Sequence, residues 1–135
     1  MGKKAAGFFR LIADLFCCFY SPFLEINDTH VFNPDWTPHA RIHEVWQLIT
    51  NSGIGFFCLW LAWVKKDVKI SAIVSMLVTG GFLLAFSVKE FYGGSMKYLD
   101  GSEKTFLGIN IGILGFGIAF ILLLLVMVWN KRLKQ

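Results

Sequence analysis

The stretch from Phe106 to Trp129 contains no charged side chain and almost no polar one. A helix needs about 20 apolar residues to cross the hydrocarbon core of a bilayer, at about 1.5 Å per residue. Four apolar segments reach this length, and we place helices at about 5–24, 38–64, 70–91 and 105–130. The runs are continuous rather than alternating, which argues against the strands of a barrel. The sequence therefore predicts a single all-α transmembrane domain over 1–135, an integral membrane four-helix bundle.

The composition agrees with a multi-pass membrane location. Hydrophobic residues make up 56% of the chain and charged residues 16%, whereas about a quarter of a soluble domain is charged. The net charge is +4, but the basic residues form short clusters beside the apolar runs. They do not form a basic stripe interleaved with aromatic residues, as in nucleic-acid-binding proteins. We therefore expect the lipid bilayer, with its anionic headgroups, to be the partner of this charge, and not nucleic acid.

The basic clusters also predict the orientation of the helices. They lie before the first segment, between the second and third, and after the fourth: Lys3 and Lys4, then Lys65, Lys66 and Lys69, then Lys131, Arg132 and Lys134. Fewer basic residues lie in the other two connections. Cytoplasmic loops carry an excess of Lys and Arg, so we expect both termini in the cytoplasm. In the first segment, Arg10 and Asp14 are spaced to pair on one helix face, and this segment either spans or lies in the interface.

Small residues recur on one face of the fourth segment. Gly108, Gly112, Gly115 and Ala119 follow helical spacing. Such a stripe lets another helix approach closely, because lipid provides no hydrophobic drive for helix association. The partner is either another helix of this chain, a second copy in a homo-oligomer, or a larger membrane complex.

All three histidines lie in one short stretch before and within the second helix. Thr37 is suited to cap this helix and Pro38 to occupy its first position, so the helix begins just outside the membrane. His39 and His43 are then one turn apart on one face. Glu44, Gln47 and Asn51 form a neighbouring polar edge, which must face protein or a water-filled cavity rather than lipid.

Three interpretations of this cluster remain open. In the first, His30, His39 and His43 bind a divalent metal ion. In the second, His43 acts as a base with Glu44 as its acid partner and Asp35 as a second acid. Arg41, Gln47 and Trp46 would then contact the ligand, unless Arg41 pairs with Glu44 instead. In the third, the polar residues only tie the loop and hold the helices together.

The run from His30 to His43 reads His-Val-Phe-Asn-Pro-Asp-Trp-Thr-Pro-His-Ala-Arg-Ile-His. It resembles the loop His…Asn-Pro-x-Trp-x-x-His-Ala-x-x-His of small four-helix membrane proteins, the DoxX-like group and its relatives. The resemblance implies a four-helix membrane fold and a shared site around His30, His39 and His43, without a settled reaction. A looser similarity links the chain to the four-helix sterol-isomerase-like group, whose cavity uses His and Glu on membrane helices, although its full motif set is not present here.

Together these patterns predict a polar cavity that opens at the non-cytoplasmic face of the membrane. We expect its His and carboxylate residues to bind or transform a lipid-soluble ligand, with a metal ion in one interpretation. The alternative is a non-catalytic accessory subunit that packs against a larger membrane complex through Gly108, Gly112 and Gly115.

Overall fold

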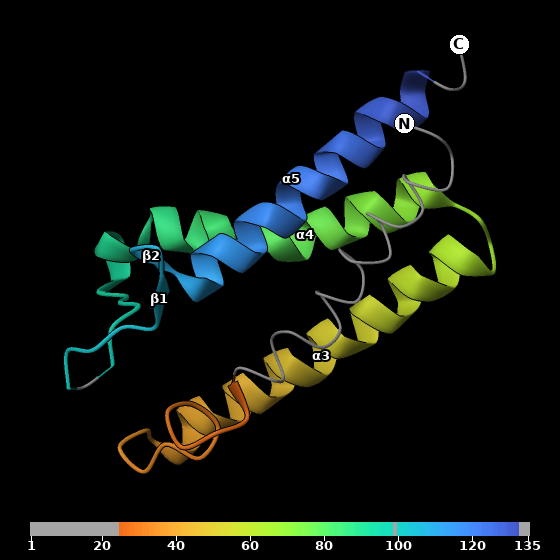
Figure 1. Ribbon diagram of the computed structural model, residues 1–135. Coiled ribbons are helices and arrows are strands. Elements are labelled where there is room, and N and C mark those ends of the chain that lie inside the picture. Colours follow the sequence, from red (N-terminus) through yellow and green to blue (C-terminus); the bar gives the residue numbers. More distant parts are fainter. Residues whose placement is uncertain (1–24, 99, 133–135) are drawn as a thin grey trace.

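The computed structural model describes residues 25–98 and 100–132, and most of this chain is helical (Figure 1). Three long helices are present in this part: α3 (Pro38–Trp63), α4 (Val68–Ser87) and α5 (Ile111–Arg132). Each contains a stretch that is long and apolar enough to cross a membrane. The helix expected at 5–24, with Arg10 and Asp14, and both chain ends lie outside the described residues.

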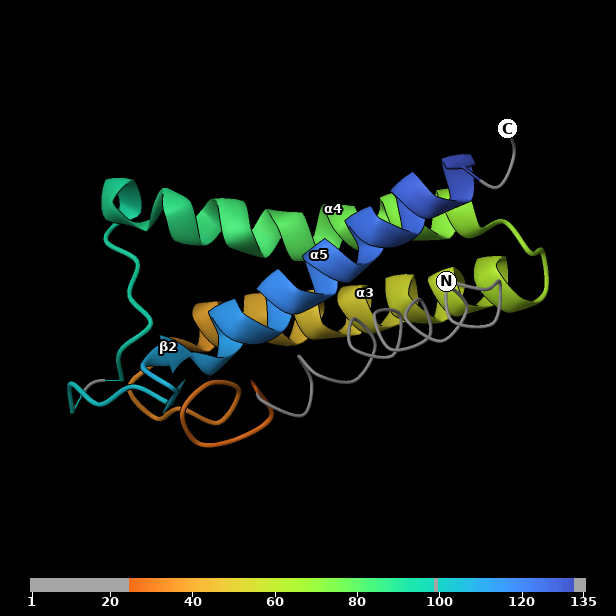
Figure 2. The same ribbon diagram turned by 45° about the horizontal axis from the view of Figure 1, so that its top comes forward.

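Helix α4 packs against both α3 and α5. It runs opposite to both of its neighbours, as the two views in Figures 1 and 2 show. The short turn 64–67 joins α3 to α4 at one end. Segment 25–37, the 3-10 helix η2 (Lys89–Tyr92) and the strands β1 (Thr105–Phe106) and β2 (Ile109–Asn110) all lie at the other end. The two longer connections therefore share one end of the bundle, as the predicted topology requires.

Side-chain caps fix where α3 and α4 begin. The Thr37 hydroxyl accepts a hydrogen bond from the backbone N–H of Ala40 at 3.2 Å, and Pro38 occupies the first turn. This confirms the predicted start of the second helix. At the start of α4, the Asp67 carboxylate accepts from the N–H of Ile70 at 3.1 Å. Both caps satisfy backbone donors that have no partner within the helix.

Helix α4 ends earlier than the sequence indicated. We expected a helix over 70–91, whereas α4 stops at Ser87 and continues as the short 3-10 helix η2. The Ser87 hydroxyl donates to the carbonyl of Leu84 at 2.7 Å, a local bond that competes with the helical pattern. Gly93, with a φ of 69°, then ends η2 in the left-handed region, where glycine has no steric penalty.

The expectation that the fourth helix begins near residue 105 is wrong. Strands β1 and β2 pair antiparallel around a two-residue turn, Leu107-Gly108, with φ values of 52° and 78°. Positive φ at both central residues is typical of a type I′ hairpin turn. Helix α5 starts only at Ile111, after Asn110. Gly108 therefore lies in a turn, so it does not belong to the predicted helical stripe of small residues.

Helices α4 and α5 pack closely along their length. Ala72 of α4 and Leu123 of α5 form a fully buried hydrophobic cluster between the two helices. The partly buried side chains of Met76 and Met127 pack against this cluster. Nearer the hairpin, the rings of Phe82 and Phe116 stack with centroids 4.3 Å apart.

The remaining small residues of the α5 stripe include Gly112 and Ala119, which are buried within this chain. A Cβ added at Gly112 would lie 3.4 Å from the ring of Phe82, so the helix face at this position meets α4. This placement agrees with the interpretation in which the stripe serves another helix of the same chain.

A stripe of small polar residues runs along the buried face of α4. Ser71, Ser75 and Thr79 are spaced four residues apart and are fully buried. The Ser71 hydroxyl donates to the backbone carbonyl of Cys58 in α3 at 3.0 Å, and the Thr79 hydroxyl donates to the carbonyl of Ser75. Small side chains and hydrogen bonds of this kind hold helices together where apolar burial gives no advantage.

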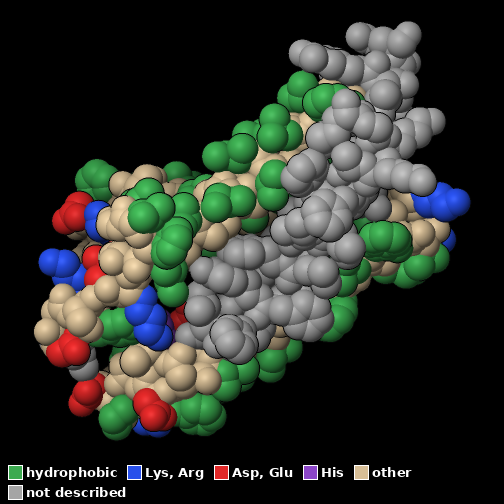
Figure 3. Space-filling view, viewed as in Figure 1, with side chains coloured by type: hydrophobic (Ala, Val, Ile, Leu, Met, Phe, Trp, Pro, Cys, Tyr) green, Lys and Arg blue, Asp and Glu red, His purple; other side chains and the backbone are tan. Residues whose placement is uncertain are grey.

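Hydrophobic side chains cover much of the outer surface of the helices, and the charged side chains gather toward the ends (Figure 3). Large apolar residues such as Ile49, Leu77 and Ile121 are more than half exposed. Exposed apolar surface of this extent is unusual for a soluble monomer and is expected where helices face lipid. The surface and the three apolar helices both support a membrane location.

Candidate functional site

A polar cavity of about 300 Å³ lies at the end of the molecule where the longer connections meet. Segment 25–37 forms one side, and the chain before β1 and the start of α5 form the other. Its charged and polar lining residues include Glu25, His30, Lys97, Tyr98, Lys104 and Asn110. We call this space the interfacial cavity.

A second hollow, of about 550 Å³, runs between α3 and α4. The α3 side is polar and presents Glu44, Gln47 and Asn51. The α4 side is mainly apolar, with Val74, Leu77, Val78 and Phe82. We call this space the interhelical groove. The positions from Val74 to Ala85 that line it span about 16 Å at 1.5 Å per residue, roughly half of the hydrocarbon thickness.

The interfacial cavity and the interhelical groove are adjacent. Glu25, Phe82 and Phe116 line both of them. The stacked rings of Phe82 and Phe116 and the side chain of Glu25 therefore lie between the two spaces. The interfacial cavity carries most of the charged lining residues, and the α4 side of the adjoining groove is largely apolar.

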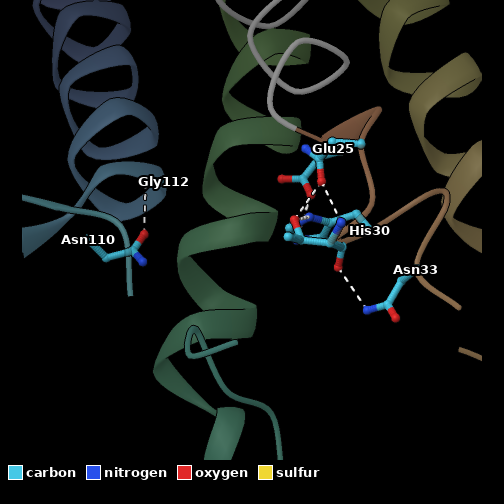
Figure 4. Close-up of polar contacts among 7 residues, drawn as sticks. Glu25, His30, Asn33, Asn110 and Gly112 are labelled. Carbon is cyan, nitrogen blue, oxygen red and sulfur yellow. Dashed lines mark hydrogen bonds and ion pairs between the residues drawn. The ribbon is translucent and has the colours of Figure 1, made fainter. Parts of the chain in front are cut away.

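The imidazole of His30 has a polar partner at each of its two ring nitrogens (Figure 4). Its Nε2 lies 2.8 Å from the Glu25 carboxylate, and its Nδ1 lies 2.8 Å from the Thr29 hydroxyl. The Asn27 amide oxygen accepts from both the backbone N–H and the hydroxyl of Thr29. Both ring nitrogens of His30 are thus engaged.

These contacts determine the protonation of the imidazole. The single hydroxyl proton of Thr29 goes to Asn27, so Nδ1 of His30 must be the donor to the Thr29 oxygen. Nε2 faces the Glu25 carboxylate at an ion-pair distance of 2.8 Å. The interaction of His30 with the accepting Glu25 carboxylate correspondingly raises the pKa of His30 above its usual value, although burial opposes the shift. The Glu25 carboxylate therefore favours the positively charged imidazolium form of His30.

The Asn-Pro-Asp-Trp part of segment 25–37 holds His30 in place. The buried Asn33 side chain donates to the carbonyl of Thr29 at 3.1 Å and accepts from the N–H of Asp35 at 2.9 Å. The rings of Trp36 and Tyr98 contact the imidazole edge to face, and their centroids lie 5.8 and 6.3 Å from the imidazole centroid. The motif thus acts as a brace that positions the histidine.

The predicted three-histidine metal site is not assembled. His39 and His43 contact each other on the exposed face of α3, with their Nε2 atoms 3.1 Å apart, whereas His30 is bonded to Glu25 in the cavity. Within residues 25–98 and 100–132, no group of three or more His, Cys, Asp or Glu side chains could hold a metal ion. The physical reason is that segment 25–37 folds around Asn33, so that His30 pairs with Glu25 and not with the His39–His43 pair.

The predicted acid–base residues also separate. Glu44 and Gln47 line the interhelical groove, while His43 packs against His39 and lies 5.9 Å from the Trp46 ring on the exposed face. Consecutive helix residues point about 100° apart, which accounts for the division between His43 and Glu44.

The other predicted residues contribute less to the two spaces. Asp35 and Trp46 are exposed. Arg41 is partly buried, and its Nε has no hydrogen-bond partner among the described residues.

Several residues of the site were not predicted as functional, among them Glu25, Asn33, Lys97, Lys104 and Asn110. Asn110 carried a readable signal, since it is an isolated polar residue in an apolar segment. Its side chain accepts from the N–H groups of Gly112 and Ile113 at 2.8 and 3.3 Å, which makes it the cap of α5. Glu25 and Lys104 had no such signal, because only the folded connections bring them to His30.

The charges of the interfacial cavity favour an anion. Lys97 and Lys104 are positive, the contact with Glu25 favours the charged form of His30, and Glu25 is the one acid among the lining residues described. Lys104 lies over the ring of Tyr98, with Nζ 5.6 Å from the centroid. In comparisons with known proteins, the chain matches no family model, no curated protein and no solved structure. The functional interpretation therefore depends on the geometry of the cationic cavity and of the apolar groove beside it.

Proposed function

We propose that this chain is a multi-pass membrane protein that binds an amphiphilic ligand with an anionic head group. The head group would occupy the interfacial cavity and the apolar chain would lie in the interhelical groove. The observation that carries the proposal is that the charged cavity and the largely apolar groove adjoin each other and share Glu25, Phe82 and Phe116 as lining residues. A fatty acid and an anionic phospholipid share the required chemistry.

The head-group end is cationic and preorganised. The two lysines and the His30 imidazolium would surround a carboxylate or phosphate, and each lysine near a membrane surface contributes about 1 kcal/mol of attraction to an anionic lipid. Because both ring nitrogens of His30 are already engaged, the histidine would contribute charge rather than accept a proton. Binding is therefore the function that this geometry favours over acid–base catalysis.

The proposed orientation follows from the basic residues at the other end of the bundle. Lys65, Lys66 and Lys69 adjoin the α3–α4 turn, and the excess of Lys and Arg in cytoplasmic loops supports a cytoplasmic location for that turn. The interfacial cavity would then open at the non-cytoplasmic face, at the depth of the headgroups. A thiol introduced at position 30 should accept a membrane-impermeant label only from the outside of intact cells, and one introduced at position 66 only after lysis.

Ligand binding can be measured through Trp36, whose ring lines the cavity. The probe is stearate brominated next to its carboxylate, because a bromine held at the head group would quench a nearby indole. We expect saturable quenching of the purified protein in zwitterionic nanodiscs, and loss of that quenching in Trp36→Phe. The methyl ester of the same probe, which lacks the charge, should bind weakly. Stearate should compete with the probe, and competition by phosphatidylglycerol at lower concentrations than stearate would identify a phospholipid as the preferred source of the head group.

Two matched pairs of variants test the two ends of the site. Neutralising Lys97 and Lys104 together to Gln should weaken binding roughly 30-fold, or about 2 kcal/mol, whereas the same change at Lys65 and Lys66 should not.

In the groove, Gly81→Phe should block the apolar chain. Gly53→Phe makes the same change on α3 at a position that does not line the groove, and an added Cβ meets nothing within 4 Å at either glycine. The proposal is refuted if the site variant and its control bind the brominated probe with the same affinity in both pairs.

A further inference from the structure

The contact between His39 and His43 lies outside the proposed ligand site. Both residues are exposed on the first two turns of α3, and neither lines the interfacial cavity or the interhelical groove. Their rings are nearly perpendicular, at 82°, with centroids 4.5 Å apart. The two Nε2 atoms are separated by 3.1 Å.

This separation has a direct meaning for metal binding. Zinc–imidazole bonds are about 2.0–2.1 Å long. Two nitrogens 3.1 Å apart and each about 2.05 Å from one ion would enclose an angle of roughly 98° at the metal. That value lies between the 90° of adjacent positions in a square plane and the tetrahedral angle. The pair therefore has the spacing of two ligands of one ion before any ion is bound.

We propose that His39 and His43 form a two-histidine site for a divalent late transition-metal ion on the outer face of α3. In the free protein one imidazole donates to the other. On binding, the donor ring would move its proton from Nε2 to Nδ1, so that both Nε2 lone pairs reach the metal and no net proton is lost.

The ligand set also indicates which ions the site takes. Imidazole nitrogen is a good ligand for copper, nickel and zinc. A given nitrogen site binds Cu²⁺ more tightly than it binds Ni²⁺ or Zn²⁺. No third His, Cys, Asp or Glu joins the pair among the described residues, so water would fill the remaining positions. An open, water-filled shell on an exposed helix face makes a site of moderate affinity.

Trp46 provides a built-in reporter, because its ring lies 5.9 Å from that of His43 and is itself exposed. The experiment titrates CuCl₂ into tag-free protein in nanodiscs and follows tryptophan fluorescence. We expect saturable quenching at one equivalent of Cu²⁺, largely absent in Trp46→Phe. ZnCl₂ should compete for the same site.

The control is the third histidine. His39→Ala and His43→Ala should each weaken Cu²⁺ binding by at least about tenfold. Loss of a residue that only hydrogen-bonds to a metal ligand already weakens metal binding by about that much, and these variants remove a ligand itself. His30→Ala should leave the affinity unchanged. Because both residues of the pair are exposed, their variants should keep the far-ultraviolet spectrum of the parent, and His39→Gln and His43→Gln provide a second series.

Paramagnetic resonance gives a readout that does not depend on affinity. The Cu²⁺ spectrum should show splitting from two imidazole nitrogens in the parent protein and from one in either single variant. The proposal is overturned if the three proteins share one spectrum and one affinity, or if His30→Ala causes the same loss.

Discussion

The ion pair between Glu25 and His30 makes a quantitative prediction about stability. In Glu25→Gln the side chain keeps its shape and loses its charge, so the imidazolium no longer faces a carboxylate. The two atoms are 2.8 Å apart, and the side chains are 26% and 29% exposed. A hydrogen bond to a charged group contributes about 1.5–3 kcal/mol, and this partial exposure favours the lower end. We expect the variant to lose about 1.5 kcal/mol of unfolding free energy at pH 6.

The loss should depend on pH in one direction. The pKa of His30 is raised in the folded state, chiefly by its hydrogen bond to Glu25. Its stabilisation is therefore complete below the unfolded-state value of about 6.5 and disappears as the pH rises through the folded-state pKa. The difference between parent and variant should be largest near pH 6 and should shrink toward pH 9.

Unfolding in mixed micelles by sodium dodecyl sulfate, followed by tryptophan fluorescence, measures this difference at each pH. Glu90→Gln is the matched control, because Glu90 pairs with Lys89 at 3.0 Å but is 83% exposed. Exposed pairs contribute little, so this change should have almost no effect at either pH. The reasoning would be refuted if the difference in unfolding free energy between the parent and Glu25→Gln stayed constant from pH 6 to pH 9. A folded-state pKa of His30 at or below 6.5, measured by NMR, would refute it as well.

Three further substitutions test local features by the same unfolding assay. Asn110→Ala should cost about 1 kcal/mol because α5 loses its cap, whereas Asn110→Asp should retain most of the stability; equal losses would argue against capping. Gly112→Leu should cost about 1–3 kcal/mol because its side chain would press on Phe82, while Gly117→Leu, where a Cβ meets nothing within 4 Å, should be nearly neutral. Gly108→Val should cost about 1–2 kcal/mol because its φ is 78°, and an unchanged midpoint would show that the turn adopts another conformation.

The parts of the fold that the sequence predicts best are those set by local chemistry. The start of α3 follows from Thr37 and Pro38, since a cap and an N-terminal proline act within a few residues of their own position. The apolar spans follow from length and composition. The hairpin before α5 was missed because Leu107-Gly108 lacks the Asn-Gly or Asp-Gly pair that usually marks a type I′ turn, and its strands are only two residues long.

The site was harder to predict because it depends on contacts between distant segments. The polar edge of α3 was identified from helical spacing, and Glu44 and Gln47 do line the groove. The proximity of Lys104 and Tyr98 to His30 could not be predicted, because the connection between α4 and α5 carries both residues to segment 25–37. Spacing in the sequence grouped the three histidines, whereas the hydrogen bonds of Asn33 separate His30 from the other two.

The buried hydroxyls of α4 have a consequence for how a chain with these three apolar helices would enter a membrane. The hydrogen bond from Ser71 to the Cys58 carbonyl joins α3 and α4 close to their four-residue turn, so the two helices are already linked at the point where the chain reverses. A pair joined in this way can leave the translocon as one helical hairpin, with its hydroxyls already satisfied before they meet hydrocarbon. Helix α5 would then dock onto a preformed surface, and an error in its insertion would leave the first hairpin intact.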